Sequence, residues 1–135
     1  MIIDSHAHLD YPQLASDLPA VLGRAGEAGV DQVISIGVKL TTAHQPRAIA
    51  ETYDNVWFSV GVHPHEAGNE DDACNVDAFI AAADHPKCVA IGEAGLDYHY
   101  DYAYASAFAP APTSYVLRPT SYFLLHSSYL RLPTS

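Results

Sequence analysis

The sequence predicts an α/β fold in which helices cover a parallel sheet. Four short apolar segments, at residues 2–5, 30–38, 56–62 and 88–92, have the composition of strands that are buried on both faces. Segments with helical spacing of apolar residues lie between them, and this alternation is typical of a doubly wound sheet or a barrel. The GxGxxG pattern of dinucleotide-binding sheets is absent after the first segment, so the chemistry has to be sought at the strand ends.

Turn residues and apolar spacing delimit three helices between these strands. The first is expected over about residues 18–28, with Asp17 as its N-cap and Gly29 placed to stop it. The second is expected to open at Thr41 or Thr42, whose hydroxyls can cap a helix. The third has a stripe of four apolar residues at helical spacing, Val76, Phe79, Ile80 and Ala83.

Composition and charge limit the range of functions. The chain has 135 residues and a formal net charge of −10, from 16 acidic and 6 basic residues. This balance disfavours broad electrostatic binding to nucleic acid or anionic membranes, but it is compatible with an enzyme whose positive charge comes from bound divalent metal ions. Two cysteines without CxxC spacing, and the lack of a signal-like or 18-residue apolar segment, predict a cytoplasmic protein without a disulfide framework or a membrane span.

The composition changes abruptly after Asp101. All 16 acidic residues and all 8 glycines lie at or before it, whereas the remainder is rich in Ala, Ser, Thr, Pro and Tyr and has a seven-residue repeat. Recurring proline excludes a coiled coil. We therefore divide the chain into a folded unit at 1–101 and a low-complexity tail at 102–135, which we interpret as frameshifted or disordered. A contact segment for a partner is the alternative.

Two histidines close the first predicted strand. Side chains alternate along a strand, so His6 and His8 share one face, with Asp4 beneath them. At the carboxyl end of a parallel strand such a pair can hold one divalent cation. The alternative is a chance pattern, because a chain with 8 histidines has a second HxH pair at His63 and His65.

Further candidates follow the third and fourth strands. Glu93 stands at the exit of a buried strand, where a carboxylate is costly unless it is paired or metal-bound, and it could bridge two cations; a surface loop acid is the alternative. His63, and with it His65, could bind metal or a substrate phosphate, or be a structural histidine. Asp97, Asp10 and Asp4 could form hydrogen bonds that fix the orientation of the metal ligands.

Three motifs in order resemble the N-terminal signatures of the TatD family of metal-dependent DNases. They are Asp4-Ser5-His6-Ala7-His8-Leu9-Asp10, Phe58-Ser59-Val60-Gly61-Val62-His63-Pro64-His65 and Ala90-Ile91-Gly92-Glu93-Ala94-Gly95-Leu96-Asp97-Tyr98. The resemblance covers residues 1 to about 101. It implies the N-terminal half of a (β/α)8 TIM barrel, with about four βα units, in the metal-dependent hydrolase superfamily.

The resemblance also implies a reaction and a ligand set. The expected reaction is hydrolysis of DNA, or of a small phosphodiester, by metal-activated water, with two divalent ions such as Mg²⁺, Zn²⁺ or Mn²⁺. In this comparison His6 and His8 ligate one metal, Glu93 bridges both, and His63 lies close to the substrate phosphate.

The chain departs from the family pattern after Asp101. Family members add two later metal-binding histidines and a late aspartate, whereas here His126 is the only later histidine and no carboxylate follows. We therefore expect this chain to be truncated and inactive. The alternatives are a non-catalytic metal-binding or interaction fragment, and a superfamily hydrolase of a small ester, lactone or amide.

Overall fold

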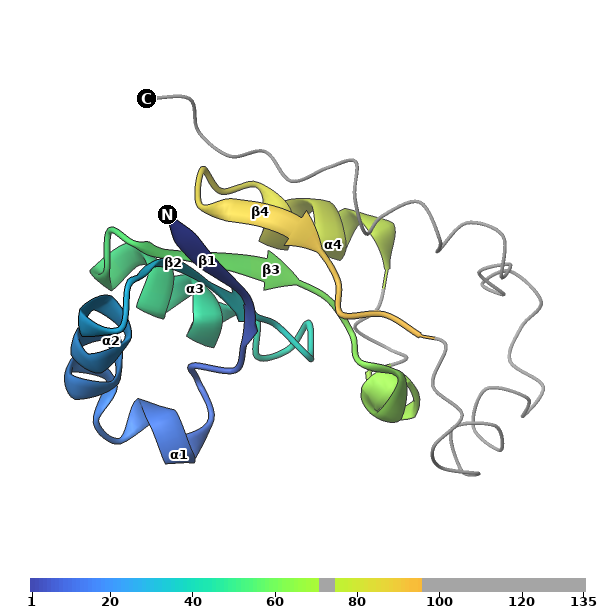
Figure 1. Cartoon of the computed structure of the whole chain (residues 1–135). Coiled ribbons are helices and arrows are strands. Elements are labelled where there is room, and N and C mark those ends of the chain that lie inside the picture. Colours follow the sequence, from blue (N-terminus) through green and yellow to red (C-terminus); the bar gives the residue numbers. More distant parts are fainter. Residues whose placement is uncertain (71–74, 96–135) are drawn as a thin grey trace.

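The computed structural model describes residues 1–70 and 75–95, and strands and helices alternate along these residues (Figure 1). The elements, in chain order, are β1 (Ile2–Ala7), α1 (Pro12–Ala15), α2 (Leu18–Glu27), β2 (Val30–Ile36), α3 (His44–Thr52), β3 (Val56–Val60), the 3-10 helix η1 (Pro64–Asn69), α4 (Val76–Ala83) and β4 (Cys88–Ile91). The predicted boundary at residue 101 and the tail lie outside the described residues.

The four strands form one parallel sheet in the order β1-β2-β3-β4. Each strand therefore pairs with its neighbour in the sequence, and a helix makes each connection, as in successive βα units of a barrel. The predicted α/β class with about four βα units is confirmed. Because the strands are parallel, all their carboxyl ends lie at the same edge of the sheet.

One face of the sheet is covered by α2, α3 and α4. Outward-facing strand residues Val56, Phe58 and Val60 are fully buried against this helical layer, which contributes Leu22 from α2 and Ala50 from α3. Burial of each large apolar side chain stabilises the folded state by about 1.5–3 kcal/mol. This layer holds the strands, and so their ends, in place.

The other face of the sheet has a separate apolar cluster, to which only strand residues contribute within the described part of the chain. Ile34, Ile36 and Val89 are buried there, with Trp57 packed against them. Ile34 pairs directly with Trp57 across β2 and β3, which places the two side chains on the same face. Ala7 of β1 packs against the helix-side core, so its neighbour His6 projects from this opposite face.

The first predicted helix has the expected length, but its cap differs. Gly29 follows α2 with a φ of 88°, a left-handed conformation that glycine adopts without strain, and it ends the helix as predicted. Asp17 occupies the N-cap position, yet its side chain makes no capping hydrogen bond. The prediction of an Asp17 cap was therefore wrong.

The start of α3 was also predicted incorrectly. The helix begins at His44, with Ala43 at its N-cap and no side-chain cap. Thr41 instead donates hydrogen bonds from its backbone N–H and its hydroxyl to the buried carboxylate of Glu70, with the backbone bond at 2.9 Å. A contact 29 residues away in sequence has replaced the local cap.

The apolar stripe of α4 is only partly buried. Phe79 packs against the core, and the helix begins at Asn75, whose side chain accepts a hydrogen bond from the N–H of Ala78 at 2.9 Å. Val76 and Ile80, however, are 66% and 60% exposed. The predicted stripe therefore does not coincide with the packed face.

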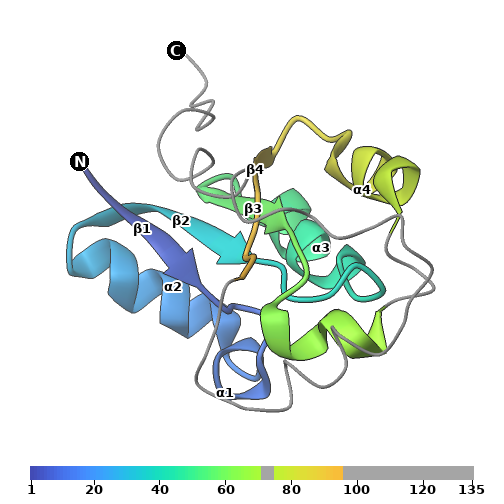
Figure 2. The same ribbon diagram turned by 90° about the vertical axis from the view of Figure 1, so that its right-hand side faces the viewer.

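Short segments after β1 and β3 gather near the carboxyl ends of the strands. Figure 2 shows α1 and the green helix η1 on the same side, beyond the point where β1 ends. Neither segment was predicted. Among the described residues, no helix is both long and apolar enough to cross a bilayer.

Candidate metal centre

Side chains from the first and fourth strands meet at this edge of the sheet. His6 lies in β1, His8 follows it, and Glu93 follows β4 by two residues. The His6 Nε2 atom lies 3.7 Å from Oε1 of Glu93, and the His8 Nε2 atom lies 3.9 Å from Oε2. One potential ligand atom from each of the three residues lies within 4.8 Å of the others. Residues more than 80 positions apart in sequence therefore converge.

These separations suit a shared cation. Metal bonds to imidazole nitrogen and carboxylate oxygen measure about 2.0–2.2 Å, so one ion can join two ligand atoms up to about 4.2 Å apart. The nitrogen–oxygen distances of 3.7 and 3.9 Å lie within that reach and beyond hydrogen-bond length. The side chains of His8 and Glu93 are 26% and 28% exposed, although Oε2 of Glu93 itself is buried.

The backbone fixes the tautomer of His8. Its Nδ1 lies 3.3 Å from the carbonyl oxygen of Ile36, at the end of β2. A carbonyl can only accept, so the hydrogen is on Nδ1 and the lone pair of Nε2 points toward Glu93. Metal-binding histidines use the same arrangement, with the second ring nitrogen donating to a carbonyl or carboxylate.

Glu93 carries an oxygen without a hydrogen-bond partner. Its Oε2 is buried and accepts no hydrogen bond within the described part of the chain. Oε2 also faces the Nε2 atom of His8. When the His8 ring is neutral, a lone pair on each of these two atoms therefore points toward the other. A buried unpaired carboxylate oxygen is costly, and a divalent cation between these atoms would remove that cost. The donor set therefore fits a metal ion.

His63 lies beside the same carboxylate in a different protonation pattern. Its Nε2 is 3.9 Å from Oε1 of Glu93, and its Nδ1 accepts a hydrogen bond from the backbone N–H of His65 at 3.2 Å. The neutral ring therefore carries its hydrogen on Nε2 and presents a donor, not a lone pair. The His65 ring packs edge-on against that of His63, at 4.5 Å between centroids.

The predicted supporting carboxylates are placed unevenly. Asp4 accepts a hydrogen bond from the backbone N–H of His6 at 3.0 Å, so it contacts that residue through the backbone and not the ring. Asp10 lies beyond His8, with one buried oxygen, Oδ1, that has no hydrogen-bond partner within residues 1–70 and 75–95. Asp97 lies outside the described residues.

Two small residues hold Glu93 in position: Ser59 in β3 and Gly61 directly after it. The Ser59 hydroxyl, in a residue only 1% exposed, donates to the carbonyl of Gly92 at 2.7 Å and accepts from the N–H of Gly37 at 3.4 Å. Gly61 lies so close to the Gly92–Glu93 backbone that a Cβ there would be 2.2 Å from the Gly92 carbonyl carbon. Sequence reasoning missed Ser59, although a hydroxyl inside an apolar strand was a usable signal.

A cavity of about 460 Å³ lies beside the metal centre. Tyr11 lines it and also stacks on the His8 ring, with 4.8 Å between centroids and 19° between planes. Lys39 lines it too, 2.9 Å from the Glu66 carboxylate. We call this the Tyr11–Lys39 cavity; its lining also includes Asp10, Val38, Thr42 and Gln45.

Electrostatics in this cavity follow from burial and one ion pair. Burial, and then the nearby carboxylates of Asp10 and Glu93, raise the pKa of Tyr11 above its ordinary value, so the phenol stays protonated. The hydrogen bond with Lys39 lowers the pKa of Glu66, and the same bond raises the pKa of Lys39. Both groups of the pair are therefore charged at neutral pH.

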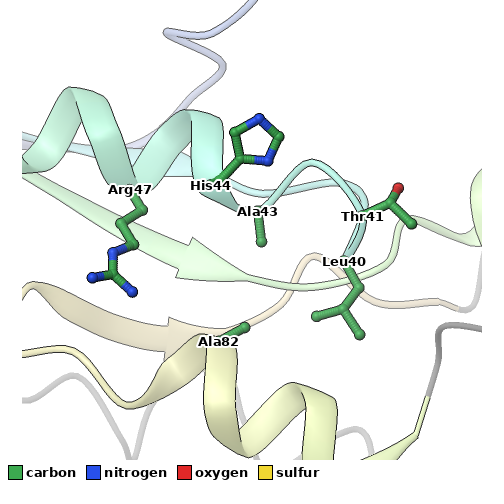
Figure 3. Close-up of a pocket in the computed structure, with 6 residues that line it drawn as sticks. All are labelled: Leu40, Thr41, Ala43, His44, Arg47 and Ala82. Carbon is green, nitrogen blue, oxygen red and sulfur yellow. The ribbon is translucent and has the colours of Figure 1, made fainter.

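A second cavity, of about 310 Å³, lies between α3 and α4 (Figure 3). Its lining residues are Leu40, Thr41, Ala43, His44, Arg47 and Ala82. None of the predicted site residues is among them. The Arg47 side chain there is paired with Glu51 at 2.8 Å. Because its lining shares no residue with the cluster of His6, His8 and Glu93, this cavity is not part of the metal centre.

A family model described as TatD-related DNase matches residues 3–109. The chain belongs to the TatD-related DNase family. Two relatives have informative names. YabD of Bacillus subtilis, named as an uncharacterized metal-dependent hydrolase, is 37% identical over 103 residues, which are 75% of this chain and 39% of YabD. The 3′-5′ ssDNA/RNA exonuclease TatD of Shigella flexneri is 34% identical over 102 residues, which are 76% of this chain and 39% of that protein.

Solved structures of TatD proteins have the same fold. YJJV, a TatD homologue from Escherichia coli, superimposes with a TM-score of 0.63 and 29% identity over 76% of this chain and 40% of that chain. A TatD-family hydrolase from Entamoeba histolytica gives a TM-score of 0.64 and 26% identity over 72% and 38%. The chain therefore spans about two fifths of the length of these relatives. Membership in this family of metal-dependent hydrolases implies a divalent metal cofactor.

Proposed function

We propose that this chain provides the metal-binding, N-terminal half of a site that hydrolyses phosphodiester bonds in DNA, with a single strand as the substrate form. The proposal rests on the convergence of His6, His8 and Glu93 in a member of the TatD family, with Oε2 of Glu93 lacking a hydrogen-bond partner among the described residues. The name of the Shigella relative supports a single-stranded nucleic-acid substrate.

Each residue has a definite part in this proposal. His6 and His8 would hold one divalent cation through Nε2, and Glu93 would contribute one oxygen to it and the other to a second cation. Bound divalent cations would supply activated water and neutralise charge on the phosphate oxygens. His63 would donate its Nε2–H to a phosphate oxygen, which its tautomer allows and a lone pair would not. His65 would fix that tautomer.

Metal binding is the first test. Titration of the chain with Mn²⁺ in a calorimeter should show binding that the double variant His6→Ala/His8→Ala abolishes. His44→Ala is the matched control, because His44 is exposed on α3 and lies outside the cluster. Unchanged stoichiometry in the double variant would overturn the proposed centre.

Substrate binding is the second test. Fluorescently labelled hexathymidylate should bind the Mn²⁺-loaded chain, lose affinity when the metal is chelated, and bind less tightly to His63→Ala than to His44→Ala. Equal affinity with and without metal would contradict the phosphodiester assignment. Two expectations from the sequence stay predictions: that residues 1–135 alone do not turn over substrate, and that the protein is cytoplasmic.

A further inference from the structure

The Tyr11–Lys39 cavity has the size and position of a substrate subsite. Its volume of about 460 Å³ lies within the range of 300–1,000 Å³ that is typical of small-ligand pockets. It adjoins the metal centre through Tyr11, which lines the cavity and stacks on His8. A ligand in this cavity would therefore lie next to any phosphate held by the metal centre.

Tyr11 provides an aromatic surface there. One face of its ring packs on the His8 imidazole at an interplanar angle of 19°, which restrains the ring. The residue nevertheless remains 42% exposed, so a substantial part of it is uncovered. Exposed aromatic rings beside a phosphate-binding centre are the platforms on which single-stranded nucleic acids stack their bases.

Lys39 provides a cation at the same place. Four lysines and arginines occur in the part of the chain that the structure describes, and only Lys39 follows a strand at the carboxyl edge. Arg24 is on α2, Arg47 is on α3, and Lys87 precedes β4. The Lys39 side chain is paired with Glu66 at 2.9 Å but keeps 34% of its surface exposed. It can therefore face a phosphate without leaving its partner.

Resting on the proposed function, we propose that the Tyr11–Lys39 cavity is a subsite for one nucleotide of a single strand, adjacent to the phosphate at the metal centre. Tyr11 stacks on the base, and Lys39 faces a neighbouring phosphate. A nucleotide is the ligand that combines a flat base and a phosphate.

The stacking role is tested with hexathymidylates that each carry one abasic position, bound to the Mn²⁺-loaded chain. The wild-type chain should lose about ten-fold in affinity at one position, because stacking of a base on an aromatic side chain is worth about 1–3 kcal/mol. Tyr11→Leu should bind the intact hexamer about ten-fold more weakly, and its affinity should not fall further when that position is abasic. Tyr11→Phe should behave like the wild type.

The role of Lys39 is tested by salt dependence. Loss of one phosphate contact to a single strand should reduce the slope of log affinity against log salt by about 0.7. Lys39→Gln should show this reduction, and Arg24→Gln should not. The double variant Lys39→Gln/Glu66→Gln leaves the net charge unchanged, so a reduced slope in it reports a lost contact.

The outcomes separate this subsite from the proposed function. Metal-dependent binding of hexathymidylate that is insensitive to every abasic position would overturn the subsite and leave the proposed function standing. So would a Tyr11→Leu variant that still senses the same position as the wild type. Failure of the metal-loaded wild-type chain to bind hexathymidylate at all would overturn both. Mn²⁺ affinity, measured in each variant, should be unchanged in Lys39→Gln.

Discussion

Replacing Gly61 by alanine should displace the carboxylate of the metal centre. A Cβ at this position would lie 2.2 Å from the carbonyl carbon of Gly92 and 2.4 Å from the backbone nitrogen of Glu93. Real Cβ atoms essentially never approach closer than 3.0 Å, and both contacted atoms are backbone. The Gly61 backbone and the segment that carries Glu93 must therefore move apart by at least 0.8 Å, the difference between 3.0 and 2.2 Å.

That displacement is large on the scale of metal coordination. Ligand distances in metal sites hold to within about 0.2 Å, and disturbing groups that orient the ligands typically reduces metal affinity by about 10- to 100-fold. We expect Gly61→Ala to bind Mn²⁺ weaker by about that factor in calorimetric titration. Overpacking also costs stability, by about 1–3 kcal/mol, so titrations belong at a temperature where circular dichroism shows the variant folded.

Gly23→Ala is the matched control for this change. Gly23 lies in the middle of α2, and a Cβ there would meet no atom of the described residues within 4 Å. Alanine should raise the stability of the helix by about 0.5–1 kcal/mol and leave metal affinity unchanged. The reasoning is refuted if folded Gly61→Ala binds Mn²⁺ as tightly as the wild type and Gly23→Ala do.

Three further changes test the scaffold. Ser59→Ala leaves the part-buried carbonyl of Gly92 without the Ser59 donor. Urea unfolding should therefore show a loss of about 1–3 kcal/mol, together with weaker Mn²⁺ binding, and equal values would contradict the positioning role of Ser59. Lys87→Met removes two hydrogen bonds, at 2.6 and 2.8 Å, to carbonyls at the end of α3. It should lower the free energy of unfolding by about 1–3 kcal/mol, and an unchanged urea midpoint would show that these bonds do not stabilise the fold. Because Lys39 lowers the folded-state pKa of Glu66 below 4.5, this pair stabilises the fold above that pH, and its contribution is lost as the pH falls through the lowered value. Glu66→Gln should therefore flatten the loss of stability on acidification below pH 4.5, and an unaltered pH profile would exclude the pair as a contributor.

The sequence predicted the position of the site through two simple regularities. Alternation along a strand places His6 and His8 on one face, and parallel strands bring all carboxyl ends to one edge. Together they place Glu93 and the two histidines at the same edge of the sheet. Two strands separate β1 from β4, so only the barrel that the family resemblance implies predicts that the three side chains meet. The structure brings these three side chains together. Their role as metal ligands stays a proposal that the titrations above address.

Local rules failed where a distant partner competed for the same group. Thr41 is a good helix cap by type, but the buried carboxylate of Glu70 accepts both of its donors, so α3 begins three residues later. Likewise Val76 and Ile80 fall at helical spacing with Phe79, yet only the phenylalanine reaches the core. Spacing along one helix does not reveal which side the sheet will occupy.

Contacts between neighbouring strands were equally hidden from the sequence. Ser59 and Gly61 act on Glu93 through the backbone of Gly92, more than 30 residues further along the chain. Predicting these contacts requires the register of β3 against β4, which is itself irregular between Phe58 and Ser59. A register shift of this kind has no signature in a single sequence, because it depends on packing across the pair.

The proposed roles of His8 and His63 depend on the backbone group beside each ring, and not on residue type. For His8 that group is the carbonyl of Ile36, which places the hydrogen on Nδ1 and leaves a lone pair on Nε2 for a cation. For His63 it is the N–H of His65, which reverses the pattern and presents a hydrogen-bond donor to the same carboxylate. One carboxylate, Glu93, thus has a potential metal ligand on one side and a potential phosphate donor on the other. A site that must hold a cation and an anion within a few ångströms needs both, and the fold supplies them by ending β2 in an acceptor and following β3 with a donor.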